Sequence, residues 1–125
     1  ICIDTASKKI TASVEGGQSP VYAVYYDGSV WVANHSEGRV TRINPETRTE
    51  TVIPVPGTML YGMVPLDGFL WVASTWEKSL FAIDPKTDTV KKRIAVSGNP
   101  YQITAVGKEL WVSATDCSII EVVKP

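Results

Sequence analysis

Short apolar runs of about four to eight residues follow one another along this chain, with Gly, Pro, Asn and Asp between them. The runs are rich in Val, Ile, Thr and aromatic residues, which is the composition of β-strands. No segment keeps the 3.6-residue period of an amphipathic helix over about eleven positions. The pattern therefore predicts an all-β fold without helices.

The apolar pattern returns every 40 residues, the interval that separates Trp31, Trp71 and Trp111. Other aligned columns hold Val32, Val72 and Val112; Ile43, Ile83 and Val123; and Asp4, Asn44 and Asp84. Each full repeat contains four short apolar runs, and four-stranded repeats of about 40–45 residues are typical of β-propeller blades. We therefore expect β-propeller blades of four antiparallel strands, with about three repeats per chain.

The second run of each repeat is apolar on both faces, with Val30 and Val32 on one side and Trp31 and Ala33 on the other. A sheet that is covered on both sides is what stacked blades require. We expect the three aligned tryptophans to be core residues rather than parts of a ligand cage.

The residues between the runs predict specific turns. Asp27-Gly28 and Asp67-Gly68 favour type I′ hairpins, because both central positions of that turn need a positive φ. At Asn44-Pro45 and Asp84-Pro85, proline presets φ and the preceding side chain can accept hydrogen bonds from the backbone ahead.

Three blades do not close a ring alone, because natural propellers have about four to eight. The expected blade units are residues 21–60, 61–100 and 101–125, the last completed by a strand equivalent to residues 1–20. Two copies could pair head to tail into a six-bladed ring, each N-terminal strand completing the partner's last blade. Alternatively, the chain is an excerpt of a longer propeller. We expect the assembly, and other ring sizes stay open.

Composition adds mainly exclusions. The apolar fraction of 44%, the charged fraction of 20% and the net charge of −1 are those of an ordinary globular protein. The Lys and Arg residues are scattered, so no nucleic-acid partner is expected, and no apolar run of about 18 residues predicts membrane insertion. The start at Ile1, without an initiator Met or signal peptide, suggests a processed product, an excerpt or an engineered chain.

The two cysteines, Cys2 and Cys117, have neither metal spacing nor a disulfide framework. Each is expected to be a free, buried thiol. A bridge between them is conceivable only if the ends of the chain meet.

Candidate binding residues lie in the loops between the second and third runs, NHSEGR, STWEKS and SATDCS, and at the starts of the first runs. The residues of these loops differ between repeats at positions that the fold does not constrain, and such loops often carry functional residues. The set is His35, Glu37, Arg39, Tyr61, Trp76, Glu77, Tyr101 and Asp116.

Each of these candidates also has an ordinary structural interpretation. His35 beside Glu37 could be a general base or a metal ligand, but no second His or Cys ligand stands at a zinc-like spacing, so a solvated loop histidine is expected. Trp76 could be a stacking platform for a sugar or peptide, or could cap a blade edge. Tyr61 and Tyr101 could line the central channel or simply pack.

The run GxLWVAxxxxxxLxxIDPxTxTVxxxIxVxGxPY resembles the bacterial propellers of the YVTN-repeat and streptogramin (virginiamycin B) lyase-like group, over nearly all 125 residues. The resemblance implies the propeller fold and a secreted or periplasmic location. The group includes a magnesium-dependent lyase that uses a His with acidic metal-binding partners, but this chain has one His and no matching local motif.

Three functions follow from these observations. The expected one is a non-catalytic scaffold or binding module that assembles with itself, without cofactor or catalytic residues. The first alternative is a lyase-like enzyme, or a fragment of one, with Mg²⁺ or another divalent ion in the central channel. The second is a propeller that binds a small molecule, a glycan or a peptide. No GxSxG, HExxH, P-loop or GxGxxG motif is present.

Overall fold

The computed structural model describes residues 1–125, and all of its regular elements are β-strands. They are β1 (Cys2–Asp4), β2 (Lys9–Ala12), β3 (Pro20–Tyr26), β4 (Ser29–Asn34), β5 (Arg39–Ile43), β6 (Glu50–Pro54), β7 (Leu60–Leu66), β8 (Phe69–Ser74), β9 (Ser79–Asp84), β10 (Thr89–Ala95), β11 (Pro100–Val106), β12 (Glu109–Ala114) and β13 (Ile119–Val123). The predicted all-β fold is confirmed, and no helix capable of crossing a membrane is found.

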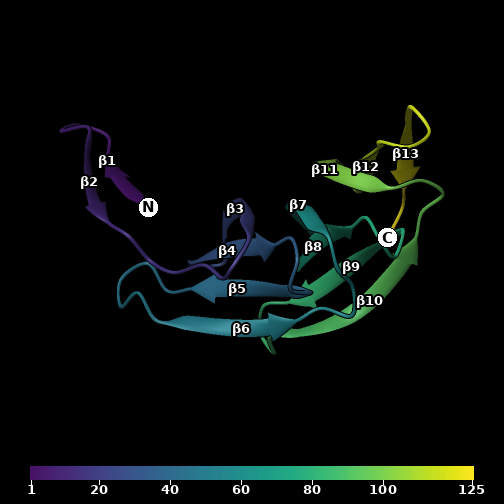
Figure 1. Ribbon diagram of the computed structural model, residues 1–125. Coiled ribbons are helices and arrows are strands. Elements are labelled where there is room, and N and C mark those ends of the chain that lie inside the picture. The colour runs from purple at the N-terminus through teal and green to yellow at the C-terminus, as the bar shows by residue number, and fades with distance from the viewer.

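The strands form two four-stranded antiparallel sheets, β3–β6 and β7–β10, and one three-stranded sheet, β11–β13. The hairpin β1–β2 forms a separate two-stranded sheet. Figure 1 shows the three larger sheets side by side in an arc, with β3, β7 and β11 toward its concave side and the hairpin at one end. The molecule is therefore an incomplete β-propeller.

The predicted turns are confirmed. Asp27 and Gly28 have φ values of 48° and 72°, and Asp67 and Gly68 have values of 49° and 80°, as a type I′ hairpin requires. The Asn44 Oδ1 accepts hydrogen bonds from the backbone N–H groups of Glu46 (2.8 Å) and Thr47 (3.1 Å). The corresponding side-chain oxygens of Asp84 and Asp4 accept from Lys86 N (2.9 Å) and Ser7 N (2.6 Å).

Each sheet buries its two faces differently. We call the face that carries Trp31, Trp71 or Trp111 the tryptophan face, and the face that carries Val32, Val72 or Val112 the valine face. Between the tryptophan face of β3–β6 and the valine face of β7–β10 lies a core of Trp31, Ala33, Val40, Ile53, Val55, Leu60, Met63, Leu70, Val72, Phe81 and Ile83. Between the next two sheets lies a core of Trp71, Ala73, Leu80, Ala82, Val96, Ile103, Leu110 and Val112.

The third aligned tryptophan departs from the prediction. Trp31 and Trp71 are fully buried, whereas Trp111 is 40% exposed, so the expectation that it is a core residue is wrong for the single chain. The reason is the position of β11–β13 at the end of the arc, where no further sheet covers its tryptophan face.

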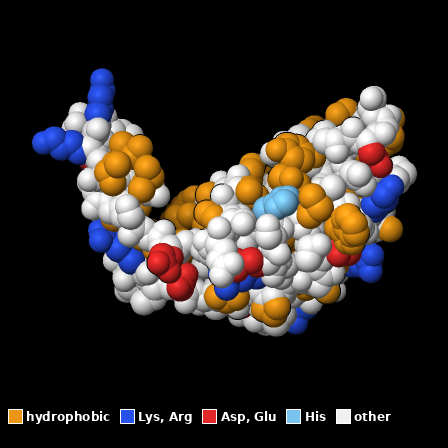
Figure 2. Space-filling view, in the orientation of Figure 1, with side chains coloured by type: hydrophobic (Ala, Val, Ile, Leu, Met, Phe, Trp, Pro, Cys, Tyr) orange, Lys and Arg blue, Asp and Glu red, His pale blue; other side chains and the backbone are white.

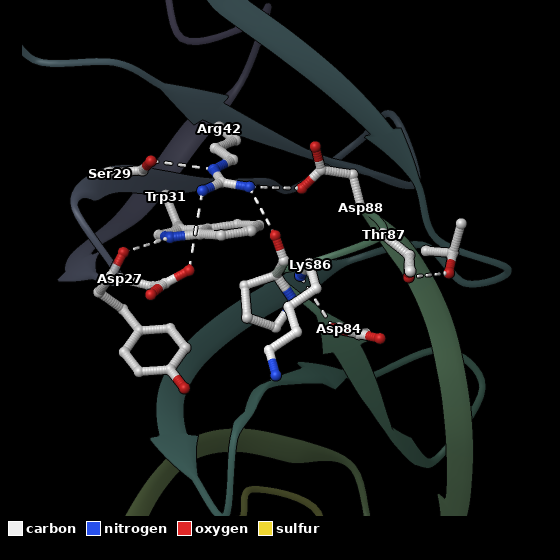
Figure 3. A network of polar contacts seen from close by, with 11 residues as sticks. Asp27, Ser29, Trp31, Arg42, Asp84, Lys86, Thr87 and Asp88 are labelled. Carbon is white, nitrogen blue, oxygen red and sulfur yellow. Dashed lines mark hydrogen bonds and ion pairs between the residues drawn. The ribbon is translucent and has the colours of Figure 1, made fainter.

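An arginine present in only one repeat ties two sheets together. The Arg42 guanidinium lies 4.8 Å from the centre of the Trp31 ring. Its Nη1 donates to the Pro85 carbonyl oxygen (2.7 Å) and to Asp88 Oδ1 (2.9 Å), in the turn between β9 and β10. Its Nε donates to Ser29 Oγ (2.9 Å), so the planar group is held on three sides, as Figure 3 shows.

Both cysteines are free and exposed, so the prediction of buried thiols is wrong. Cys2 lies in the short strand β1 of the separate hairpin, and Cys117 lies in the loop between β12 and β13, where little covers either side chain. Partial desolvation and the neighbouring Asp116 carboxylate raise the pKa of the Cys117 thiol.

Candidate binding face at one end of the blades

One end of the blades gathers the loops that the sequence singled out. The residue that follows each second strand donates its backbone N–H to a carbonyl just before the first strand of the same blade. These bonds join His35 to Ser19 (2.9 Å), Thr75 to Met59 (3.2 Å) and Thr115 to Asn99 (3.1 Å). They place the loops β4–β5, β8–β9 and β12–β13 beside the starts of β3, β7 and β11.

Three of the predicted binding residues are structural acceptors on this face. Glu37 Oε2 accepts a hydrogen bond from Gln18 N (3.0 Å), and Glu77 Oε2 accepts one from Thr58 N (2.8 Å). Asp116 Oδ1 accepts one from Asn99 N (2.6 Å). Each carboxylate therefore ties its loop to the segment that leads into the first strand of its own blade.

The third of these carboxylates stands one residue out of register. The 40-residue alignment places Cys117, not Asp116, in the column of Glu37 and Glu77. The segment from Gly98 to Pro100 is one residue shorter than the segment from Gly57 to Leu60, so its backbone N–H is presented to an earlier and shorter side chain. That difference in length was visible in the sequence, but its consequence for Asp116 was missed.

The charges of these residues are also engaged within the chain. The Arg39 guanidinium lies 2.9 Å from Glu37 Oε2, and Lys78 Nζ lies 3.3 Å from Asp116 Oδ2. Desolvation works against ionisation of Glu77, but hydrogen bonds from Ser74 and Thr58 outweigh it and lower the pKa of the carboxyl. The hydrogen bond from Asn99 lowers the pKa of Asp116. All three carboxylates therefore already have partners within the chain.

The Glu77→Gln substitution is expected to lower the free energy of unfolding at pH 7 by about 1 kcal/mol, because a charge-assisted hydrogen bond to Thr58 is weakened. A carboxyl with a depressed folded-state pKa stabilises the fold above its unfolded pKa and loses that contribution as the pH falls through the folded value. The difference between wild type and variant in urea unfolding should therefore shrink below about pH 4.5, the ordinary pKa of Glu. Glu46→Gln, at an exposed side chain without a hydrogen-bond partner, is the control; an equal effect there contradicts the prediction.

The remaining candidates on this face are aromatic. The His35 and Tyr61 rings meet edge to face, with centroids 4.9 Å apart and planes at 66°. The Tyr61 and Tyr101 rings are 4.2 Å apart at 45°. Trp76 is exposed on the β8–β9 loop, and no aromatic contact links it to these rings. The blades thus bring together three of the eight candidates as one continuous aromatic group.

The side chains of the described chain, residues 1–125, form no group of three or more His, Cys, Asp or Glu that could hold a metal ion. His35 Nδ1 lies 3.2 Å from Ser36 Oγ, and no carboxylate is hydrogen bonded or ion paired with its imidazole. The aromatic group and its polar edge are therefore what this face offers a ligand.

Comparison with solved structures supports the fold. The chain is similar to hydrazine synthase of Kuenenia stuttgartiensis, with a TM-score of 0.77 and 20% identity over 93% of this chain and 36% of that one. It is similar to the WD40 β-propeller domain of Doa1 (TM-score 0.70, 10% identity, 81% and 35% of the two chains). It is also similar to apo AztD from Citrobacter koseri (TM-score 0.68, 17% identity, 94% and 34%).

These likenesses identify a β-propeller, and at such low identity they carry the fold alone. The chain spans about a third of the length of each of these three proteins. No protein-family model matches the sequence, and no curated protein matches it either. The comparisons therefore confirm a propeller without reaching the YVTN-repeat or streptogramin-lyase group.

Proposed function

We propose that this chain is a non-catalytic β-propeller scaffold and binding module that closes into a ring with a second copy of itself. The observation that carries the proposal is the apolar surface left at the two ends of the arc. Its non-catalytic character is supported by the candidate binding face, where the carboxylates bind backbone N–H groups and the His35 ring contacts Ser36 and Tyr61.

One end of the arc is the tryptophan face of β11–β13. Here Trp111 and Ile120 are 40% and 60% exposed, whereas their counterparts one repeat earlier, Trp71 and Leu80, are fully buried. The same positions are apolar in both repeats, so the difference comes from the missing neighbour and not from the residue types. This face is chemically prepared for a valine face to pack on it.

The other end is the valine face of β3–β6. Tyr25 on this face is 67% exposed, and Ala23 is also exposed, whereas Met63, the counterpart of Ala23 in β7–β10, is buried. The hairpin β1–β2 covers this face only in part. It leaves a groove of about 270 Å³ whose lining includes Cys2, Val14, Ala23, Val30 and Ile43.

A second copy is the occupant that both ends fit. The chain already contains two interfaces between a tryptophan face and a valine face, so the two open ends have the two surfaces of that same interface. Pairing both ends with a second chain gives six blades, within the range of about four to eight seen in natural propellers. Such a two-chain ring closes, and it leaves no exposed blade face.

Strand pairing gives the same direction of assembly. The third strands β5 and β9 each pair with a fourth strand, β6 and β10. The equivalent third strand β13 has no such partner, so its outer edge is open. Strand β2 has the position of a fourth strand, since its pair Ile3 and Ile10 lies at the same repeat positions as Ile83 and Val90. For β2 to pair with β13 of the second copy, β1 must be displaced, because it occupies the same edge.

Native mass spectrometry with light scattering tests the proposal. At about 10 µM we expect a species of twice the 13.6 kDa chain mass, because a dimer with a dissociation constant of about 1 µM or lower is mostly assembled at that concentration. A single chain of 13.6 kDa at about 100 µM contradicts ring closure by a second copy. A larger closed species changes the number of blades but keeps the pairing of the end faces.

A further inference from the structure

We propose that His35, Tyr61 and Tyr101 form a binding site for a neutral sugar ring at the channel mouth. We call this group the aromatic arc. It goes beyond ring closure, because all three side chains belong to one chain and meet without a second copy. Figure 2 shows the single histidine on the concave side of the molecule with hydrophobic side chains next to it.

The aromatic arc crosses all three larger sheets. His35 follows β4, Tyr61 lies in β7 and Tyr101 lies in β11, so each ring comes from a different blade. The contacts of 4.9 Å and 4.2 Å between ring centres hold the rings against one another. The stacking of the blades therefore fixes the geometry of the aromatic arc before any ligand binds, and this lowers the entropic cost of binding.

The framework does not require aromatic residues at these positions. Val21 stands in the first repeat where Tyr61 and Tyr101 stand in the others, and β3 pairs with β4 in the same register. Thr75 and Thr115 stand where His35 does. The rings are thus an addition to the propeller repeat, and Tyr101 remains 39% exposed.

The free polar groups of the aromatic arc are two phenol hydroxyls and one imidazole nitrogen. The nearby carboxylates Glu37, Glu77 and Asp116 already accept backbone hydrogen bonds. No hydrogen bond within the chain involves the phenol oxygen of Tyr61 or Tyr101, and the only one made by the His35 ring uses Nδ1. The aromatic arc therefore offers aromatic faces bordered by two hydroxyls and one imidazole nitrogen. The aromatic faces can pack on the apolar face of a pyranose, and the polar groups can hydrogen bond to its hydroxyls.

The spacing of the rings decides where the sugar lies. A ring held between two aromatic faces needs centres about 7 Å apart, twice the usual carbon–carbon contact distance. The 4.2 Å between Tyr61 and Tyr101 leaves no room for one. A pyranose therefore lies on the exposed part of Tyr101 rather than between the two rings, and an oligosaccharide that continues along the aromatic arc reaches the polar atoms of Tyr61 and His35.

Because the chain has one histidine, the imidazole resonances of His35 report on the aromatic arc directly. We would titrate the full chain with cellohexaose and with maltohexaose while following these resonances by NMR. We expect saturable shifts with at least one of the two sugars, with a dissociation constant in the millimolar to micromolar range. Tyr101→Val, which installs the residue type found at position 21, should weaken binding about tenfold or more.

Two controls separate this site from its alternatives. Trp76→Ala removes an exposed aromatic outside the arc and should leave the affinity unchanged. Ile120→Glu, at an end face, should keep the affinity even if ring closure is lost, so failure of the two proposals can be told apart. Absence of shifts with both sugars at about 10 mM overturns the sugar site. Shifts with tetramethylammonium but with neither sugar also overturn it, because they identify a site for cations. Unchanged binding by Tyr101→Val, or loss of binding in Trp76→Ala, contradicts the assignment to the aromatic arc.

Discussion

Replacing Trp71 with alanine is expected to lower the free energy of unfolding by about 3–5 kcal/mol, the usual cost of removing a buried aromatic side chain. Trp71 is fully buried between β7–β10 and β11–β13, where it packs with Leu80, Ile103 and Leu110. The cavity left by the substitution cannot collapse easily, because the other side chains of this core keep the two sheets apart. The unpaired, buried indole N–H of Trp71 offsets a small part of the loss.

The same substitution one repeat later provides the matched comparison. Trp111→Ala removes the same side chain from the same repeat position, but Trp111 is 40% exposed in the single chain. We expect a loss of about 1–2 kcal/mol, in proportion to the smaller apolar area that is removed from water. Urea unfolding at a concentration where one chain is present measures both values. Equal losses in the two variants contradict the proposed difference in packing.

Ring closure changes that comparison in a defined direction. In the proposed two-chain ring, Trp111 would be buried under the valine face of the second chain at concentrations where two copies pair. The cost of Trp111→Ala should then approach that of Trp71→Ala, and its apparent size should depend on protein concentration. A concentration-independent result for Trp111→Ala argues against its burial by a second copy.

Local features of the fold could be predicted from the sequence because they depend on residues a few positions apart. Asp27-Gly28 adopts the expected backbone because a type I′ turn needs positive φ at both positions, and few residue pairs meet that need. Asn44 accepts its turn hydrogen bonds for an equally local reason. The recurrence of the second strands that contain Trp31 and Trp71 predicts that the blades stack on one another, because both faces of each of these strands are apolar.

Features that depend on a neighbouring blade or on a small change in loop length could not be predicted in the same way. Trp111 has the sequence environment of Trp71, and only its place at the end of the arc exposes it. Asp116 replaces Cys117 as the backbone acceptor because the segment after Gly98 is shorter. The buried or exposed state of a residue in a repeat protein is set by the next repeat as much as by its own.

The candidate site shows the same division. The repeat alone places His35, Tyr61 and Tyr101 at one end of the blades, but the sequence left open whether the two tyrosines line the channel or simply pack, and it favoured a solvated loop position for His35. It could not predict that the three rings touch, because that contact depends on the angle between successive blades. The carboxylates were chosen for their variable loops, but their hydrogen bonds to Gln18 and Thr58 give them a structural role.

Ile120→Glu is expected to convert the proposed two-chain ring into single chains, with an increase of at least about 100-fold in the dissociation constant. Ile120 is 60% exposed on the tryptophan face of β11–β13, so the single chain tolerates a carboxylate there. In the closed ring the same carboxylate would be buried against a valine face without a partner, which costs several kcal/mol. Ile119→Glu is the matched control, because Ile119 is the adjacent residue of the same strand, is 42% exposed and points to the opposite face. Light scattering should show 13.6 kDa for the first variant and twice that mass for the second, and an undisturbed ring in Ile120→Glu contradicts the proposed pairing of the end faces.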